Sequence, residues 1–357
     1  MTPNEDANLI QELFPWVSTP PIISAPMRGV SGPELAVEVS KAGGLGFIGP
    51  GLTESSLELN LIQAEKLVAG ISQFQKLDVL PIGVGFIVWD SVLEVALNVI
   101  LKYRPSAVWL FAAREGQKDF DLWINKLNEV SPATKIFIQL GSVTQAIEAF
   151  KSKSRPDLIV VQGSDAGGHG LKKGCGLIPL LLEIRDKLDE LSYSLKIPKL
   201  PLIAAGGIAE GRGVAASLIL GASGVAMGTR FLASNESLVA QGYKNALIEA
   251  EDGGQNTKRT FLFDQLRGTT GWPKDYNGRS VINQSVRDDE LNSIPFEENK
   301  KLYEEALAKG DQGWGFENGR LTTFAGAEVG LIKKIEPAAQ LVFKVREDAI
   351  KCLHIAL

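Results

Sequence analysis

The chain has 357 residues, 45% of them hydrophobic, and is long enough for one large barrel or two ordinary domains. Its formal net charge of −5 argues against nucleic acid or an anionic membrane surface as a partner. It has two cysteines, no signal peptide and no apolar run near the roughly 20 residues of a spanning helix, which predicts a soluble cytoplasmic protein.

Short apolar runs alternate with helical patterns over the first 235 residues. Strands are expected at 21–27, 45–48, 81–87, 107–111, 135–140, 158–161, 201–205 and 224–227. Helices are expected at 34–41, 55–69, 91–103, 120–128, 143–151, 177–191 and 211–220. Non-alternating apolar strands that each precede a helix are typical of an α/β protein with a (β/α)8 TIM barrel. A doubly wound open sheet is the alternative, but the G-x-G-x-x-G expected after its first strand is missing.

The pattern changes after residue 235. Helices are expected at 237–250 and 297–309, with a polar, glycine-rich stretch between them and an amphipathic helical tail from 328 that Pro337 interrupts. We therefore expect a barrel (1–235), a mostly helical subdomain of helices and loops inserted after strand eight (236–320), and a C-terminal helical segment that returns to the barrel (321–357). An insertion after strand eight lies at the catalytic end of a barrel and is a candidate substrate lid.

The stretch V-V-Q-G-S-D-A-G-G-H-G at 160–170 joins a buried strand to a glycine-rich loop. This loop holds His169, one of only two histidines in the chain. A histidine at the mouth of such a loop is where an α/β enzyme places an acid–base or anion-facing group. A turn histidine without chemistry is the alternative interpretation.

Two glycine turns follow the last two strands, A-A-G-G-I at 204–208 and A-M-G-T-R at 226–230. TIM barrels bind phosphate at this position, where glycines let backbone N–H groups approach the anion at a helix N-terminus. Thr229 adds a hydroxyl donor. The pair of turns favours a phosphate site over two tight turns without a ligand.

The other strand ends bring small and apolar residues, with a few amides, to the barrel mouth at 25–27, 83–85, 139 and 162–163. Such a lining suits a flat heteroaromatic ring, and with one phosphate it predicts FMN as the cofactor. Gln139 is expected to donate to the N1/O2 edge of the ring, where negative charge develops on reduction. Packing for Met27 and an internally satisfied amide for Gln139 are the alternatives.

Two further features carry weaker signals. Cys175 follows the His169 loop, where some nucleotide dehydrogenases of this fold keep a thiol nucleophile, but we expect it in a loop that leads away from the ring. The run R-G-T-T-G-W-P at 267–273 offers a cation, two hydroxyls and an indole, either as an anion-accepting pocket or as a packed turn. The sequence has no metal-site spacing and no P-loop.

With these motifs the chain resembles the nitronate monooxygenases, formerly called 2-nitropropane dioxygenases, in their longer eukaryotic-type branch. The resemblance covers nearly the whole chain. It rests on P-I-I-S-A-P-M-R-G-V-S (21–31), K-A-G-G-L-G-F-I-G (41–49), P-I-G-V-G-F-I-V-W (81–89), L-I-A-A-G-G-I-A-E-G-R-G (202–213), G-A-S-G-V-A-M-G-T-R-F (221–231) and the stretches at 160–170 and 267–273.

The resemblance implies an FMN-containing barrel with a helical subdomain over the flavin. It also implies oxidation of alkyl nitronates, and of nitroalkanes, by O2 to a carbonyl compound and nitrite through a flavin semiquinone. His169 matches the family's catalytic histidine, which acts as a base toward neutral nitroalkanes. The matching positions and the strand ends together give the expected flavin contacts: Ala25, Pro26, Met27, Gly83, Gln139, Gln162, Gly167, Gly168, Ala205, Gly206, Gly207, Met227, Gly228 and Thr229.

Two positions depart from the family pattern. Gln139 stands where some shorter members carry a lysine, which bears on the redox tuning of the flavin. G-A-E-V-G at 326–330 stands where an amide-containing G-Q-G-V-G-like motif is common, and we expect this departure to affect only a peripheral loop. Because a nitronate is an anion, we expect a protonated His169, with Arg267, to supply the positive charge that holds it.

Two other functions stay open on the same scaffold. FMN-dependent enoyl-acyl-carrier-protein reductases also carry an A-G-G-H loop, and they reduce a double bond with NAD(P)H. A barrel that binds FMN without turnover is the other alternative, against which the intact His169 argues. The expected partners are a small nitronate or nitroalkane and O2, with the oligomeric state, including a homodimer, left open.

Overall fold

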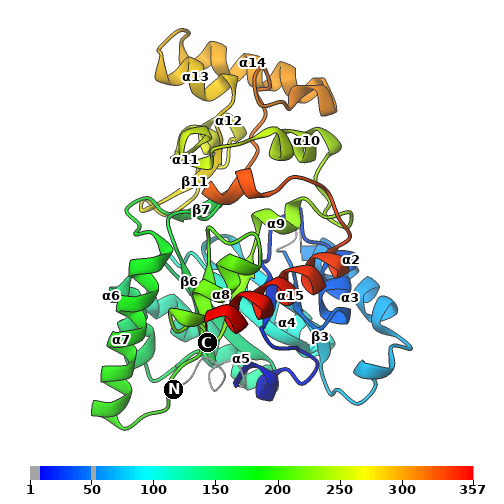
Figure 1. The fold of residues 1–357 in the computed structure, drawn as a ribbon, viewed down its shortest axis with the longest axis vertical. Helices are drawn as coiled ribbons and strands as arrows, with labels where there is room; N and C mark the ends of the chain where they lie inside the picture. Colours follow the sequence, from blue (N-terminus) through cyan, green and yellow to red (C-terminus); the bar gives the residue numbers. More distant parts are fainter. Residues whose placement is uncertain (1–8, 50–53, 357) are drawn as a thin grey trace.

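Eight parallel strands close into a barrel in the computed structural model, which describes residues 9–49 and 54–356 (Figure 1). The strands follow the order β1-β2-β3-β4-β5-β6-β8-β9, and β1 pairs with β9 to complete the closure. They are β1 (Ile22–Ser24), β2 (Leu45–Ile48), β3 (Leu80–Ile87), β4 (Pro105–Phe111), β5 (Lys135–Leu140), β6 (Leu158–Gln162), β8 (Leu202–Ala205) and β9 (Gly224–Met227). The predicted TIM barrel is confirmed.

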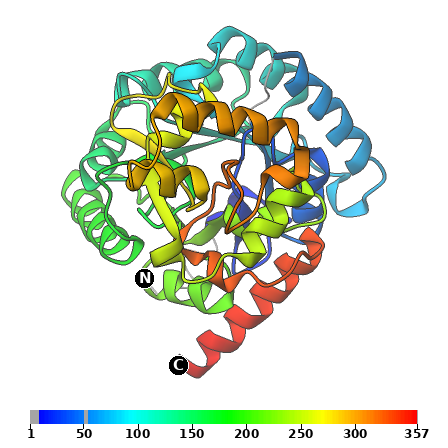
Figure 2. The ribbon, with the colours of Figure 1, turned by 90° about the horizontal axis from the view of Figure 1, so that it is seen from above.

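Helices form the outer ring around these strands (Figure 2). They are α2 (Pro33–Lys41), α3 (Glu54–Val68), α4 (Leu93–Tyr103), α5 (Gln117–Val130), α6 (Val143–Lys151), α7 (Leu177–Leu195) and α8 (Gly211–Ile219), with 3-10 turns η1 (Ser72–Phe74) and η2 (Val88–Asp90). Individual residues determine where these helices begin. Ser142 caps α6 by accepting a hydrogen bond from the Gln145 backbone N–H, and Pro33 occupies the first turn of α2, where its missing N–H costs nothing.

Aromatic side chains fill the interior of the barrel. The rings of Phe47, Trp109 and Phe137 pack with centroids 5.3 to 6.0 Å apart, and Phe14 joins them from the segment before β1. Offset and edge-to-face pairs of this kind add roughly 0.5–1.5 kcal/mol each beyond the burial of area. The packed interior leaves a cavity at the carboxyl ends of the strands, where barrels place their active sites.

A subdomain lies across these carboxyl ends (Figures 1 and 2). After α9 (Thr229–Leu232), which follows β9, its elements are α10 (Gln241–Glu249), α11 (Gly253–Asn256), β10 (Thr257–Thr260), α12 (Leu262–Arg267), β11 (Tyr276–Val281), α13 (Gln284–Glu290), α14 (Phe296–Ala308) and η3 (Gly310–Gly313). The helix expected from 237 begins only at Gln241. The strands β10 and β11 were not expected from the sequence.

The His169 loop also contains a strand that the sequence did not indicate, β7 (Gly168–Leu171). It leaves the barrel and pairs antiparallel with β11, in a three-stranded sheet of order β10-β11-β7. His169 lies opposite Gly278 in this pairing. His169 therefore follows a barrel strand along the chain, while the strand that carries it is hydrogen-bonded to the subdomain.

The last part of the chain returns to the barrel. It passes through the short turn η4 (Ala327–Leu331) and, directly after Pro337, forms α15 (Ala338–Ala356). The helix α15 packs against α8 and α2. Arg346 of α15 is buried and donates to the carbonyls of Ala42 and Gly43 at 3.0 and 2.7 Å. None of the helices in residues 9–49 and 54–356 is long and apolar enough to cross a membrane.

Candidate active site

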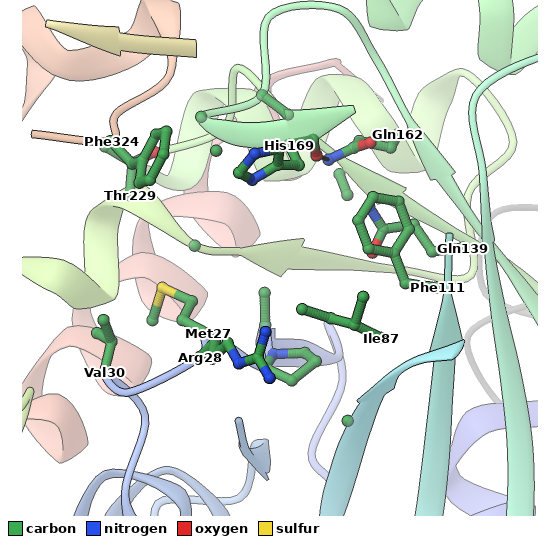
Figure 3. A pocket seen from close by; sticks show the side chains of 18 of the residues that line it. Met27, Arg28, Val30, Ile87, Phe111, Gln139, Gln162, His169, Thr229 and Phe324 are labelled. Atoms are coloured by element: carbon green, nitrogen blue, oxygen red, sulfur yellow. Dashed lines mark hydrogen bonds between the residues drawn. The ribbon is translucent and has the colours of Figure 1, made fainter. Parts of the chain in front are cut away.

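A cavity of about 550 Å³ lies between the carboxyl ends of the strands and the subdomain, within the size range of small-molecule sites (Figure 3). Most of the residues predicted from the sequence line it: Ala25, Pro26, Met27, Gln139, Gln162, Gly167, Gly168, His169, Ala205, Gly206, Met227, Gly228 and Thr229. Tyr243, the 267–272 segment, Phe324 and Glu328 close it from the subdomain and the C-terminal segment. The structure thus gathers side chains from most of the length of the chain.

Two predicted glycines lie elsewhere. Gly83 is not among the residues that line the cavity; a Cβ there would overlap the ring of Phe47, so Gly83 makes room for the packed interior. Gly85, two residues further on the same face of β3, lines the cavity instead. Gly207 lies beside the cavity rather than on its wall, with Asp165 as the neighbour of its α-carbon.

Gln139 is oriented by its neighbour Trp109. The indole Nε1–H donates to the Gln139 side-chain oxygen at 2.8 Å. With the oxygen so used, the amide NH2 is the end of Gln139 left to serve a ligand, as expected of a donor to a ring edge. Gln162 has a different part, because its Nε2 donates to the backbone carbonyl of His169 at 3.1 Å and holds the start of β7.

His169 is held on two sides. Its Nε2 lies 2.9 and 3.0 Å from the two carboxylate oxygens of Asp264 on α12. Its ring stacks on the indole of Trp272 with centroids 3.7 Å apart and planes 6° from parallel, and Phe324 lies at 5.3 Å. The side chain of His169 is only 12% exposed. The imidazole therefore has one orientation, fixed before any ligand arrives.

Asp264 is the important residue that the sequence analysis missed. It is buried, and it also accepts a hydrogen bond from the Thr269 hydroxyl at 2.8 Å. The only signal in the sequence is an acidic residue within the apolar run F-L-F-D-Q-L at 261–266. Of the two interpretations of the 267–273 run, a pocket wall or a packed turn, the structure favours the pocket wall, since Trp272 and Arg267 both line the cavity.

The surroundings of His169 favour its neutral form. Burial lowers the pKa of His169, Asp264 opposes this effect, and the positive charges of Arg267 and Arg259 lower the pKa further. The expectation of a protonated His169 is therefore not supported, because its site disfavours the imidazolium. Arg267, whose guanidinium lies 5.1 Å from the Phe324 ring centroid, is the cation that closes this side of the cavity.

The turns after β8 and β9 form a cradle on the opposite side. Gly206 and Gly207 have φ values of 95° and 77°, which side chains rarely adopt, so their backbone N–H groups are brought close to the cavity by glycine alone. Thr229 is buried beside them at the start of α9 and accepts a hydrogen bond from the Gly326 N–H at 3.0 Å. Such a cluster of donors at a helix start suits an anion.

Glu328 also lines the cavity, which corrects the expectation of a peripheral loop. Its side chain is buried, and the nearby Thr229 hydroxyl and Gly207 backbone favour its charged form. Cys175, in contrast, is exposed and lies outside the cavity.

Comparison with known proteins agrees with this geometry. The nitronate monooxygenase family model matches residues 12–348. The nitronate monooxygenase npaC of Metarhizium robertsii is 45% identical over 97% of this chain and 95% of its own length, and the nitronate monooxygenase of Neurospora crassa is 38% identical over 94% and 90%.

Solved structures with the same architecture include FabK from Thermotoga maritima, at a TM-score of 0.73 and 25% identity over 97% of both chains. A nitroalkane oxidase from Streptomyces ansochromogenes has a TM-score of 0.70 and 24% identity over 98% of this chain and 100% of its own, which shows the shared fold. The match over most of the chain and the close relatives together decide the family: the chain belongs to the nitronate monooxygenases, which are flavin-dependent oxidoreductases.

Proposed function

We propose that the protein oxidises alkyl nitronates with O2 to a carbonyl compound and nitrite, with FMN as its cofactor, and that it also accepts neutral nitroalkanes. The observation that carries this proposal is the pairing of His169 with Asp264 over a cavity that ends in an anion cradle. The family supports the oxidation of nitronates, and the site supports the finer assignment.

The residues present fit FMN. The cradle at Gly206, Gly207 and Thr229 suits one phosphate group, because the positive φ of both glycines shapes its backbone. The Gln139 amide faces the other end, and small apolar residues line the space between them. Since the described residues form one such cradle next to this cavity, a flavin with a single phosphate is favoured over FAD. When bound, the flavin supplies the electron acceptor for the reaction.

The protein's own groups then have separate tasks. With Nε2 engaged by Asp264, Nδ1 of the neutral His169 is the nitrogen that accepts a proton from the carbon of a nitroalkane. Arg267 and the partly exposed Arg28, which pairs with Asp90, provide positive charge for the nitro or nitronate oxygens. Trp272 and Phe324 cover the histidine and keep bulk water from the reacting carbon.

We also propose the division into a flavin-binding barrel (1–235), a substrate lid (236–320) and a returning C-terminal segment (321–357). The lid contributes Tyr243, Arg267 and Trp272 to the cavity wall. The C-terminal segment contributes Phe324 and Glu328, so it takes part in the site as well as in the packing of the barrel.

A direct assay tests the proposal. Purified protein is mixed with pre-formed ethyl nitronate while nitrite and O2 are followed, and the flavin is released by heat and identified by chromatography. We expect nitrite formation with O2 consumption and FMN as the released flavin. FAD, or nitrite no faster than in a protein-free control, would overturn the assignment.

An enoyl reductase is the second candidate, because FabK shares the fold at 25% identity. Such an enzyme takes its electrons from NAD(P)H. Anaerobic addition of NAD(P)H separates the two functions: rapid bleaching of the bound flavin would favour the reductase, and an unchanged spectrum together with bleaching by a nitronate favours the proposed oxidation.

A further inference from the structure

Glu328 places a carboxylate on the donors of the phosphate cradle. Its side chain lies in the cavity wall near the Thr229 hydroxyl and the Gly207 backbone, the groups that we assign to a phosphate. The residue is only 7% exposed, and its Oε2 atom has no hydrogen-bond partner among the described residues. A Cβ on Gly326 would overlap this carboxylate, so the turn that carries Glu328 presses it against the cradle.

Charges of both signs surround Glu328, but none of the described residues forms an ion pair with it. Burial raises the pKa of Glu328 to about 7, although the nearby Thr229 hydroxyl and Gly207 backbone lower it. The negative charge of Asp165 in the β6–β7 loop also raises this pKa. Arg279 of β11 is the cation close enough to interact with both carboxylates, but its guanidinium donates to the Ser164 carbonyl and the Thr257 hydroxyl. Arg259 of β10 likewise donates a hydrogen bond to a neutral group, the Ala166 carbonyl.

The other elements packed against η4 add no free cation among the residues that the structure describes. On α9, Arg230 is paired with Glu336. On α10, the Tyr243 hydroxyl donates to the Phe324 carbonyl at 2.7 Å. Before α11, Glu251 is exposed and paired with Lys333. A phosphate dianion in the cradle would thus lie close to a second buried anion, which forms no ion pair among the described residues.

We propose that Glu328 takes up a proton when the cradle binds a phosphate monoester, so that phosphate binding and protonation of this carboxyl form one linked equilibrium. The inference rests on the proposed use of FMN. Protonation removes the repulsion and converts the unpartnered Oε2 into an O–H group that can donate to a phosphate oxygen.

The test compares FMN with riboflavin, which lacks the phosphate, on the full-length protein after removal of its flavin. Above pH 7 the phosphate of FMN is already close to dianionic, since its second pKa is about 6. Between pH 7 and 9 we expect the Kd for FMN, measured by flavin fluorescence, to rise by about tenfold per pH unit. The Kd for riboflavin should stay level over the same range.

Calorimetry in buffers of different ionisation enthalpy gives the proton count directly. We expect uptake of close to one proton per FMN at pH 8, and almost none with riboflavin. This measurement on the unaltered protein tests the proposal even where a variant fails to fold. Binding of FMN without proton uptake would overturn the inference and leave FMN as the cofactor, whereas no binding of either flavin would overturn both proposals.

Two variants assign the proton. Glu328→Gln keeps the shape and supplies an amide donor, so the FMN Kd should lose its pH dependence and fall below the unaltered value at pH 8.5. Glu251→Gln removes an exposed carboxylate on a neighbouring segment and should leave the pH dependence intact. Equal slopes in Glu328→Gln and the unaltered protein would show that another group takes the proton.

Discussion

His169 is subject to opposed influences, and its chemistry depends on their balance. Burial and the two arginines favour the neutral imidazole, while Asp264 favours the charged one. A neutral ring held in place is a ready base, and its conjugate acid is stabilised by the carboxylate as soon as it forms. This balance predicts that His169 matters most when a proton must be removed from carbon.

Replacement of His169 by Asn separates deprotonation from oxidation. Activity on neutral nitroalkanes should fall by roughly 10²–10⁴-fold, the usual loss for a general base. A pre-formed nitronate has already lost that proton, so its oxidation should fall much less. The measurement is kcat/KM for both substrates with both proteins at one pH, and equal fractional losses would contradict the role of a base.

Replacement of Asp264 by Asn tests a positioning residue. Asp264 raises the pKa of His169, so its loss should lower that pKa further and move the acid limb of the nitroalkane profile to lower pH. The plateau should also fall, by about tenfold or more, because a weaker and less well oriented base remains. A purely structural role would lower the plateau without moving the limb, and Thr269→Ala, which keeps the carboxylate, should move it little.

Among single residues, the sequence indicated those that stand out by type, namely the glycines of the turns and a histidine that is rare in this chain. The glycine turns and His169 were predictable, because glycines cluster where the backbone needs positive φ and because histidine is scarce in this chain. Asp264 and Glu328 were not, since each acts through contacts with residues distant in sequence. Gly83 was predicted to contact the flavin because the sequence does not distinguish a glycine that makes room for Phe47 from one that makes room for a ligand.

At the scale of elements, the partly buried Arg259 helps to hold the sheet β10-β11-β7 together. Arg259 on β10 donates to the backbone carbonyls of Gly168, Ala166 and Asn277 at 3.2, 2.7 and 2.6 Å. Its guanidinium thereby joins the loop that carries His169 to the strand β11. Burial lowers the pKa of Arg259 to about 10, and the guanidinium stays charged at neutral pH.

Replacement of Arg259 by Met should therefore loosen the His169 loop. Loss of these charge-assisted hydrogen bonds should reduce the free energy of unfolding by about 3 kcal/mol. Denaturant titration measures this loss, and amide hydrogen exchange of residues 164–171 should accelerate locally. Arg212→Met, on the exposed surface of α8, is the matched control and should change neither quantity appreciably.

The barrel strands were predictable because each is a continuous apolar run buried on both faces. The strands of the small sheet were not, because G-H-G-L and T-K-R-T carry neither an apolar run nor clear alternation. They are strands because a distant partner pairs with them. Non-local pairing of this kind leaves little trace in local sequence.

At the scale of the whole molecule, α15 joins the end of the chain to its beginning. Arg346 reaches from α15 to the turn between α2 and β2, and burial lowers its pKa to about 10. Arg346→Met should lower the free energy of unfolding by about 2 kcal/mol, while flavin content at low temperature stays unchanged. Lys351→Met, an exposed position on the same helix, provides the comparison, and equal stability of the two variants would count against the proposed tie.

The pairing of β7 with β11 limits how the subdomain can be transplanted between relatives. A chimera that takes residues 236–320 from another enzyme, in order to change the range of substrates, also replaces the strand that aligns His169 with Gly278. A donor one residue longer before that position would shift the register and turn the side chains of β11 to opposite faces. The transferred segment should therefore either leave 257–281 to the recipient or extend from 168 to 281, so that the strand carrying His169 and its pairing partner come from the same parent.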